Sequence, residues 1–286
     1  MNTLHAGLIG EHISRTRLPF ALEIMCGMTG RALAFELMDT AGVGGFDFDK
    51  TVDALRAKGW TGVTVTHPWK THAARYAGDG MLPELRGLGA SNTLVFGPTL
   101  TGHNTDFTGF VGAWQAQMDA PPGRVAMAGA GGVARALAPA LARLGARELV
   151  IWDMDRERAE ELAAATGPVA RVVPANQANA AIRAAAGLVN ATPLGMREYP
   201  GITFDASRIG PQRWAFDAVY TPTETVFLRA AAAAGLATLN GFALFQHMAI
   251  GSFNAYTGIA LDPAEVLPKL DALNPDRGEM TWPTKS

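Results

Sequence analysis

Short apolar runs alternate with segments of helical spacing along nearly the whole chain. In the first hundred residues, three of these runs predict strands at residues 5–10, 32–39 and 61–66. Between them, apolar residues recur at helical spacing and predict helices near residues 19–30 and 48–58. Strands that alternate with helices are typical of a parallel sheet, so this part of the chain is predicted to form an α/β layer.

Residues 91–97 and the segment that ends at Asp106 predict a hairpin, because glycine and proline between them favour a turn. A second α/β series starts after the Pro-Pro-Gly break at residues 121–123. Its predicted strands are residues 124–129, 148–153, 171–175, 188–192 and 214–219. The helical stretch from Gly241 to about Leu273 is too short to fold alone, so it is expected to pack onto one of the domains.

At 286 residues the chain exceeds the size at which one hydrophobic core stops growing, so two domains are expected. Charged residues make up 17% of it, against a globular average of roughly 25%, and apolar residues make up 48%. More surface than usual should therefore be covered by packing or by a partner subunit, which suggests a homodimer. The 24 basic and 26 acidic residues nearly cancel, and no stretch concentrates Lys and Arg, so nucleic acid is not expected as a partner.

The single cysteine, Cys26, lies in an apolar segment and is expected to be a buried small hydrophobe. The N-terminus lacks the charged start and the long apolar run of a signal peptide, and no run of about 18 apolar residues predicts a membrane span. The histidines show no metal-ligand spacing, so no metal site is predicted. These features predict a cytoplasmic protein.

The predicted strand at residues 124–129 runs into a glycine-rich turn, which is followed by a helical pattern. Glycines let the backbone approach a pyrophosphate, whose charge is favoured at a helix N-terminus by free N–H groups and by the helix dipole. This order of elements predicts a dinucleotide site, although Ala134 stands where a third glycine often stands. The predicted cofactor-binding residues of the turn are Gly129, Ala130, Gly131, Gly132, Val133 and Ala134.

Asp153, at the end of the next predicted strand, is placed to accept hydrogen bonds from the adenosine ribose hydroxyls. Its charge would repel a 2′-phosphate, so NAD is favoured over NADP. Two alternatives stay open. Asp153 could instead cap the helix predicted at residues 155–165, and Arg156 or Arg158 could bind the 2′-phosphate of NADP.

An alcohol that gives a hydride to a dinucleotide also loses its hydroxyl proton, so the site needs a proton acceptor at the oxygen. A lysine can take the proton if burial brings its pKa down from about 10.4 towards neutrality. Lys70 is the candidate for this role, and Asp106 is the candidate to orient its ammonium group. Taken singly, Lys70 could be an exposed lysine after a turn and Asp106 a helix N-cap.

Polar motifs place these two residues in a fixed order along the chain, and others follow in its second half. The motifs are Ser14-Arg15-Thr16, residues 64–70 (TVTHPWK), 91–93 (SNT), 102–106 (GHNTD), 190–196 (NATPLGM), 217–222 (DAVYTP) and 241–246 (GFALFQ). Together they resemble the shikimate/quinate dehydrogenase family, and the resemblance spans residues 5–258. It implies a two-domain α/β enzyme with a substrate-binding catalytic domain, residues 1–109 and 241–286, and a Rossmann-type NAD(P)-binding domain, residues 110–240.

The resemblance also implies the reaction, a reversible hydride transfer between NAD(P) and a ring hydroxyl or ketone of shikimate, quinate or a close analogue. It assigns Lys70 and Asp106 to catalysis. The substrate-binding residues that it implies are Ser14, Thr16, Thr66, Asn92, Tyr220 and Gln246. Further cofactor-binding residues would be Gly241 and, on the nicotinamide side, Thr192, Met196, Val219 and Leu244.

The sequence departs from the family pattern only in the substrate half of the predicted site. Thr16 replaces a serine, Thr64 replaces an asparagine, and Arg17-Leu18 are inserted before Pro19. A catalytically weak dinucleotide or shikimate-pathway ligand sensor is therefore the main alternative. An unrelated two-domain dehydrogenase with a lysine acid, such as a folate-type enzyme, is the second alternative.

Overall fold

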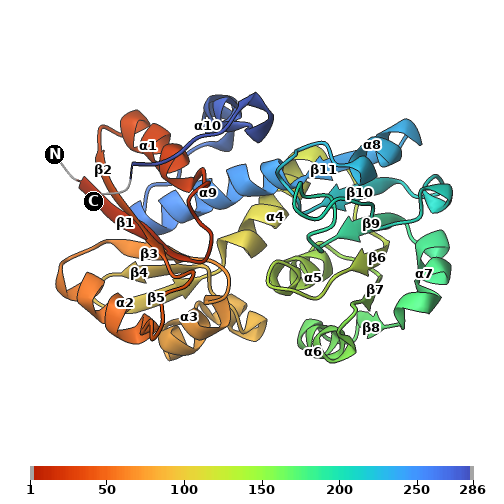
Figure 1. The fold of residues 1–286 in the computed structure, drawn as a ribbon, viewed down its shortest axis with the longest axis horizontal. Helices are drawn as coiled ribbons and strands as arrows, with labels where there is room; N and C mark the ends of the chain where they lie inside the picture. Colours follow the sequence, from red (N-terminus) through yellow and green to blue (C-terminus); the bar gives the residue numbers. More distant parts are fainter. Residues whose placement is uncertain (1–2, 284–286) are drawn as a thin grey trace. The chain divides into compact units, whose positions relative to one another are not determined.

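The computed structural model describes residues 3–283 (Figure 1). The chain divides into two compact units. One unit is formed by Met1–Thr105 together with Gln246–Ser286, and the other by Asp106–Phe245. Among residues 3–283, every helix is too short or too polar to span a bilayer.

The first unit is built on a five-stranded sheet with the order β2-β1-β3-β4-β5. The strands are β1 (Thr3–Gly10), β2 (Ala32–Asp39), β3 (Gly62–Val65), β4 (Thr93–Phe96) and β5 (Leu100–His103). Strand β1 pairs in parallel with β2 and β3, whereas β4 is antiparallel to both β3 and β5. The predicted hairpin is thus confirmed, and it makes the sheet mixed, because a connection of only residues 97–99 cannot join parallel strands.

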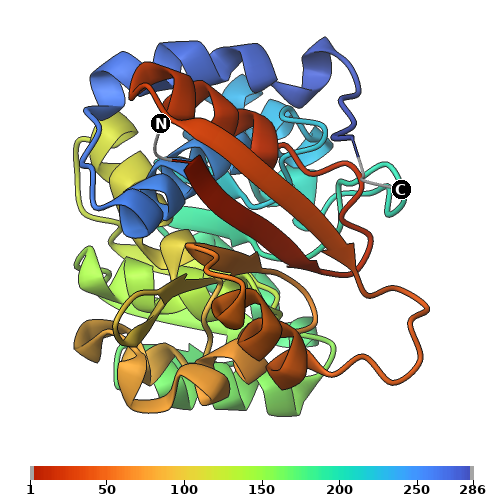
Figure 2. The same cartoon turned by 90° about the vertical axis from the view of Figure 1, so that its left-hand side faces the viewer.

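Helices cover both faces of this sheet. They are α1 (Leu18–Met28), α2 (Phe48–Ala57), α3 (Lys70–Ala77) and the end of α9 (Gly241–Thr257), whose Tyr256 packs on β3. Helix α10 (Pro263–Leu270) packs against α1. In both views, α1 and α10 lie on one face and α2 and α3 on the other (Figures 1 and 2). Cys26 of α1 is buried as expected, and burial raises the pKa of its thiol to about 11.

The second unit contains a six-stranded, all-parallel sheet with the order β11-β10-β9-β6-β7-β8. Its strands are β6 (Arg124–Ala128), β7 (Glu148–Trp152), β8 (Ala170–Val172), β9 (Gly187–Asn190), β10 (Trp214–Asp217) and β11 (Ala237–Asn240). Numbered along the chain from β6, the spatial order is 3-2-1-4-5-6, the order of dinucleotide-binding Rossmann folds. In such a sheet, ligands bind at the carboxyl ends of the two strands where the order reverses, which here are β6 and β9.

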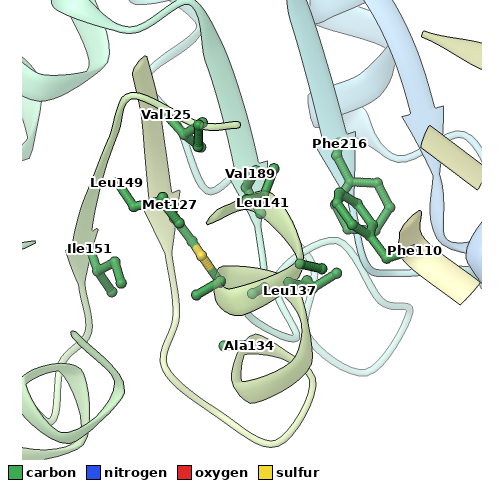
Figure 3. Packing of buried hydrophobic residues seen from close by; sticks show 14 of the residues in the cluster. Phe110, Val125, Met127, Ala134, Leu137, Leu141, Leu149, Ile151, Val189 and Phe216 are labelled. Atoms are coloured by element: carbon green, nitrogen blue, oxygen red, sulfur yellow. The ribbon is translucent and has the colours of Figure 1, made fainter. Parts of the chain in front are cut away.

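Alternate residues of these strands point into two apolar layers. Val125 and Met127 of β6 belong to one layer, and Ala126 and Ala128 belong to the other. Figure 3 shows the first layer, where α5 lays Leu137 and Leu141 against the strands. Burial on both faces requires near-continuous apolar strands, which is why the sequence pattern found most of them.

The remaining helices, together with α9, contribute side chains to these two layers. They are α4 (Thr105–Gln117), α5 (Ala134–Arg143), α6 (Arg156–Thr166), α7 (Ala178–Ala184), α8 (Val226–Ala233) and α9 (Gly241–Thr257). Residues of α4, α5, α6 and α9 contribute to the layer of Figure 3, and residues of α7 and α8 contribute to the other layer. Short 3-10 helices complete the chain at Gly78–Gly80, Pro83–Leu88, Ala175–Gln177, Ala206–Arg208, Asp271–Leu273 and Pro275–Arg277.

Candidate functional site

The glycine-rich turn follows β6 and lies tightly against the turn after β9. Gly129 has a φ of +99°, a conformation that residues with a side chain rarely adopt. A Cβ atom at this position would lie 2.7 Å from the carbonyl carbon and oxygen of Ala191. Residue 129 must therefore be glycine, both for its dihedral angle and for the close approach of the two turns.

The amino end of α5 supplies the groups that a pyrophosphate needs. The helix begins at Ala134. The N–H groups of Arg135 and Ala136 already donate to the carbonyl oxygens of Gly131 and Val133 over 3.3 and 3.0 Å, so the N–H groups left for a phosphate are those that precede Arg135. Added Cβ atoms on Gly131 and Gly132 would meet no atom of residues 3–283 within 4 Å, so the turn is open at these positions. The free N–H groups and the helix dipole fit the phosphates of a dinucleotide, which when bound would accept or donate the hydride.

Ala130 differs from the rest of the turn because its N–H is already used. It donates to Oδ2 of Asp153 over 2.7 Å, so the phosphates would depend on the N–H groups of the residues that follow. The other carboxylate oxygen, Oδ1, accepts from the N–H of Asp155 over 2.9 Å. Two backbone donors thus hold the Asp153 carboxylate at the end of β7, and each oxygen keeps a lone pair for a ribose hydroxyl.

Asp153 is not the cap of α6. The N-cap is Asp155, whose side chain accepts from the N–H of Arg158. The capping alternative for Asp153 is therefore wrong. Arg156 forms an ion pair with Glu160 over 2.7 Å, and Arg158 forms one with Asp155 over 3.0 Å. Both pairs are exposed and each is worth about 0–1 kcal/mol, so they leave either arginine free to turn to a phosphate.

The residues predicted to line the nicotinamide lie after β9, after β10 and at the start of α9. Thr192 and Met196 are half-buried, whereas Val219 and Leu244 are buried, Leu244 in the apolar layer of Figure 3. A Cβ on Gly241 would lie 2.5 Å from the carbonyl oxygen of Ala218, so α9 begins in close contact with the turn after β10. Their contact with a cofactor stays a prediction.

The structure adds a buried carboxylate that was noted in the sequence only as part of a motif. Asp217 ends β10 and is fully buried. Its Oδ1 accepts from the side-chain amide of Asn190 over 2.9 Å and from the N–H of Val219 over 3.0 Å. Its Oδ2 accepts from the hydroxyl of Thr225 over 2.6 Å. Burial raises the pKa of Asp217 to about 6, although these three hydrogen bonds lower it.

This pKa makes the stability of the protein depend on pH. Asp217 has an ordinary pKa of 3.8, so between about pH 4 and 6 the folded state binds the proton that the unfolded state has lost. The stability is fully present below that range and is lost as pH rises through 6, by about 3 kcal/mol. We expect Asp217→Asn to remove this loss. The unfolding free energy of the variant, measured relative to that of wild type, should therefore be about 3 kcal/mol higher at pH 8 than at pH 4. Urea unfolding at both pH values measures the change, and parallel pH profiles would contradict it.

Hydrogen bonds link Lys70 to the residue that precedes Asp106. Lys70 begins α3, and its carbonyl oxygen accepts from the N–H of Ser91 over 2.9 Å. Asn92 follows, and its Oδ1 accepts from the N–H and the hydroxyl of Thr105 over 2.7 and 3.1 Å. Thr105 precedes Asp106 in the chain. Three predicted residues that are distant in sequence are therefore held together by the backbone around them.

Asp106 lies within the first turn of α4, which begins at Thr105, so Asp106 is not the N-cap that the sequence left as an alternative. Lys70 and Asp106 are both half-buried. Asn92 is buried, and its Oδ1 also accepts from the hydroxyl of Thr93. Because three donors fix this oxygen, the NH2 group is the part of Asn92 that can bind a substrate hydroxyl.

Ser14 and Thr16 lie in the turn after β1. Ser14 is exposed, and the Thr16 hydroxyl accepts from the N–H of Leu18 over 3.3 Å, where α1 begins. Both residues of the inserted Arg17-Leu18 pair stabilise the first unit. Leu18 is buried, and the buried Arg17 donates to the carbonyl oxygen of Gly278 over 2.6 Å. The insertion therefore ties α1 to the C-terminal segment and leaves the hydroxyl of Ser14 exposed.

Thr66, Gln246 and Tyr220 are the other predicted substrate residues. Thr66 follows β3 and is half-buried. The NH2 group of Gln246 donates to Asp271 over 2.9 Å and to the carbonyl oxygen of Leu267 over 3.4 Å, so its carbonyl oxygen is the part left for a hydroxyl. Tyr220, which belongs to the second unit, stacks on Phe245 with ring centroids 5.9 Å apart.

Thr64, one of the departures from the family pattern, lies in the core of the first unit. It is buried, and its hydroxyl lies 2.6 Å from the hydroxyl of Tyr256 in α9. The threonine at this position therefore has a hydrogen-bond partner, Tyr256, inside the first unit.

A hollow of about 640 Å³ lies elsewhere on the second unit. Its lining includes Arg124, Arg147 and Arg213, at or next to the amino ends of strands. Ligands of such sheets bind at the carboxyl ends, so this hollow is not the dinucleotide site. Arg124 and Arg171 of its lining form ion pairs with Glu148, and Arg213 donates to the carbonyl oxygen of Pro121. Among residues 3–283, no three His, Cys, Asp or Glu residues are grouped to hold a metal ion.

The strand order and the glycine turn define the class of protein, one with a Rossmann-type sheet suited to a dinucleotide. Residues 8–94 match the family model for the shikimate dehydrogenase substrate binding domain. The quinate/shikimate dehydrogenase (NAD(+)) of Corynebacterium efficiens is 38% identical over 266 residues, which cover 90% of this chain and 93% of that protein. The chain belongs to the shikimate/quinate dehydrogenase family, and its reaction is the NAD(P)-dependent dehydrogenase reaction of that family.

Two further comparisons agree with this assignment. The shikimate dehydrogenase (NADP(+)) of Streptomyces avermitilis is 36% identical over 277 residues, which cover 93% of this chain and 94% of that protein. The structure of quinate dehydrogenase from Corynebacterium glutamicum in complex with NAD has a TM-score of 0.88 and 33% sequence identity, and it covers 95% of this chain and 100% of that one. The predicted fold class is confirmed, and NAD and NADP both occur as cofactors among the relatives.

Proposed function

We propose that the protein oxidises a ring hydroxyl of shikimate, quinate or a close analogue with NAD, and that Lys70 takes the hydroxyl proton. The carbon-bound hydrogen leaves as a hydride to the dinucleotide, the O–H bond breaks, and the proton is held on the Lys70 amine. In the reverse direction Lys70 returns it to the ketone oxygen. The observation that carries this proposal is the hydrogen-bond series that fixes Lys70, Asn92 and Thr105-Asp106.

Asp106 would accept a hydrogen bond from the neighbouring substrate hydroxyl and orient the ammonium of Lys70. Asn92 would donate its NH2 hydrogens to a second hydroxyl, since its oxygen is used. The hydroxyls of Ser14, Thr16 and Tyr220 would bind the substrate carboxylate, and Thr66 and Gln246 would bind ring hydroxyls. A site that pairs substrate hydroxyls rejects analogues lacking them by as much as about 10⁴- to 10⁵-fold.

Initial rates test the reaction and the substrate together. NADH and NADPH formation from shikimate and from quinate would be measured, with Lys70→Ala as the blank. Turnover of either acid supports the proposal. If wild type binds dinucleotide but turns over neither these acids nor their analogues, the chain is a ligand sensor.

Asp153 supports the preference for NAD. Its carboxylate is held by Ala130 and Asp155 at the end of β7, where the adenosine ribose is expected, and its charge would repel a 2′-phosphate. We expect Asp153→Ala to raise the KM for NAD by about tenfold, because it removes charge-assisted hydrogen bonds, and to leave or lower the KM for NADP. Steady-state kinetics with both cofactors measures the ratio. Asp155→Ala, which removes the cap of α6, is the control for general damage to this turn. Equal losses for both cofactors in Asp153→Ala would contradict the ribose assignment.

Two properties expected from the sequence are part of this proposal. We place the enzyme in the cytoplasm, where the buried Cys26 thiol would stay reduced. A homodimer stays a prediction that light scattering at several protein concentrations would test.

A further inference from the structure

Asp217 connects two turns and a helix at the carboxyl end of the second sheet. In the register of β9 and β10 it lies opposite Asn190, so both side chains stand at the same level of neighbouring strands. Its other donors are the N–H of Val219, in the turn after β10, and Thr225, the N-cap of α8. All three donors are neutral and all three point at the carboxylate. Holding a carboxylate out of water is costly, so this arrangement calls for a role.

Asn190 extends the connection into the turn after β9. One hydrogen of its NH2 group goes to Asp217, and the other goes to the carbonyl oxygen of Leu194 over 2.8 Å. Its oxygen accepts from the N–H and the hydroxyl of Thr192 over 3.0 and 2.7 Å. Every hydrogen-bonding position of this amide is used, so Asn190 fits only one arrangement of the turn. The position of Thr192 is therefore set by Asp217 through Asn190.

The geometry points to Asp217 as a positioning residue for the nicotinamide half of the dinucleotide site. This inference rests on the proposed function and on the expectation from the sequence that Thr192, Met196 and Val219 line the nicotinamide. It adds the group that sets the two turns carrying them. Asp217 holds Val219 directly and holds Thr192 through Asn190. The phosphates and the adenosine depend on the turn after β6 and on Asp153. Gly129 of that turn packs against Ala191, but none of the hydrogen bonds that Asp217 and Asn190 make above reaches the turn after β6 or Asp153.

That separation gives a test with two ligands. ADP-ribose shares the adenosine and phosphate groups of NADH but lacks the nicotinamide. For Asp217→Asn, which preserves shape and removes one acceptor oxygen, we expect kcat to fall by about tenfold or more, because small misplacements of reacting groups cost up to about 10²-fold. The affinity for ADP-ribose and the KM for the hydroxy acid should stay within about twofold of wild type. Emission of bound NADH, a probe of the nicotinamide surroundings, should move towards that of free NADH.

Matched variants separate this role from a structural one. Asp205 also accepts from a hydroxyl and an N–H, both of Ser207, but is exposed, so Asp205→Asn makes the same chemical change and should match wild type. Thr225→Val removes one donor to Asp217 and should act like Asp217→Asn, whereas Thr225→Ser keeps the hydroxyl and should restore the wild-type values. These two variants also decide the question if Asp217→Asn fails to fold.

Each outcome has one meaning. Lower kcat and altered NADH emission with unchanged ADP-ribose affinity support the positioning role. Wild-type kcat and emission in Asp217→Asn, or an equal loss of NADH and ADP-ribose affinity, would overturn it. If wild type turns over no substrate but binds NADH with shifted emission, the proposed reaction fails, and the NADH and ADP-ribose measurements still decide the role of Asp217. If wild type binds no dinucleotide, both proposals fail.

Discussion

Replacing Lys70 with alanine is expected to lower turnover by about 10²- to 10⁴-fold, because positioned proton transfer contributes roughly that much to a rate. The affinity for dinucleotide should change little, since the residues predicted to hold it lie on other elements. Stopped-flow measurement of NADH formation at saturating NAD would give the rate of the chemical step, and fluorescence titration would give the NADH affinity. Lys70→Arg keeps the charge but cannot give up its proton near neutral pH, so it should be as slow as the alanine variant.

Lys58→Ala is the matched control, because Lys58 is an exposed lysine at the C-cap of α2. It should keep wild-type turnover. Turnover of Lys70→Ala or Lys70→Arg at the wild-type rate would remove Lys70 from the mechanism. A large loss of NADH affinity together with the rate would instead show that Lys70 supports the fold of the site.

Replacing Gly129 with alanine is expected to cost roughly 3 kcal/mol or more of unfolding free energy and to abolish measurable dinucleotide binding. The φ of +99° alone costs an alanine about 1–3 kcal/mol. Its Cβ would also lie 2.7 Å from the carbonyl group of Ala191, so the turns after β6 and β9 would have to separate. Urea unfolding and NADH titration measure the two effects.

Gly132→Ala tests whether any side chain in the turn has this effect on stability. A Cβ at Gly132 would meet no atom of residues 3–283 within 4 Å, so its unfolding free energy should stay within about 1 kcal/mol of wild type. Equal stability of the two variants would show that the close approach at Gly129 relaxes without cost. Dinucleotide binding by Gly129→Ala at the wild-type affinity would contradict the assignment of this turn.

Most strands could be predicted because burial on both faces requires continuous apolar runs. Strand β11 was missed because it is only Ala237–Asn240 and Leu239 is its only buried residue. The sequence pattern also did not predict that the first sheet is mixed. A hairpin can join a sheet at either edge, and the pattern does not say which. The glycine turn, Lys70 and Asp106 could be proposed as site residues because each stands in a local motif with a physical reason for its residue types.

What the sequence determined by itself is therefore local. It specifies the apolar faces, the turn that needs glycine and the order of the polar motifs, because these depend on spacing of a few residues. Only the tertiary structure decided which polar groups are already used. Ala130 gives its N–H to Asp153, Gln246 gives its NH2 to Asp271, and Asp217 is buried against Asn190. Such hydrogen bonds join side chains from elements far apart in the chain, so no local pattern reports them. They decide which atoms of a motif remain free to bind a ligand and which ones hold the others in place.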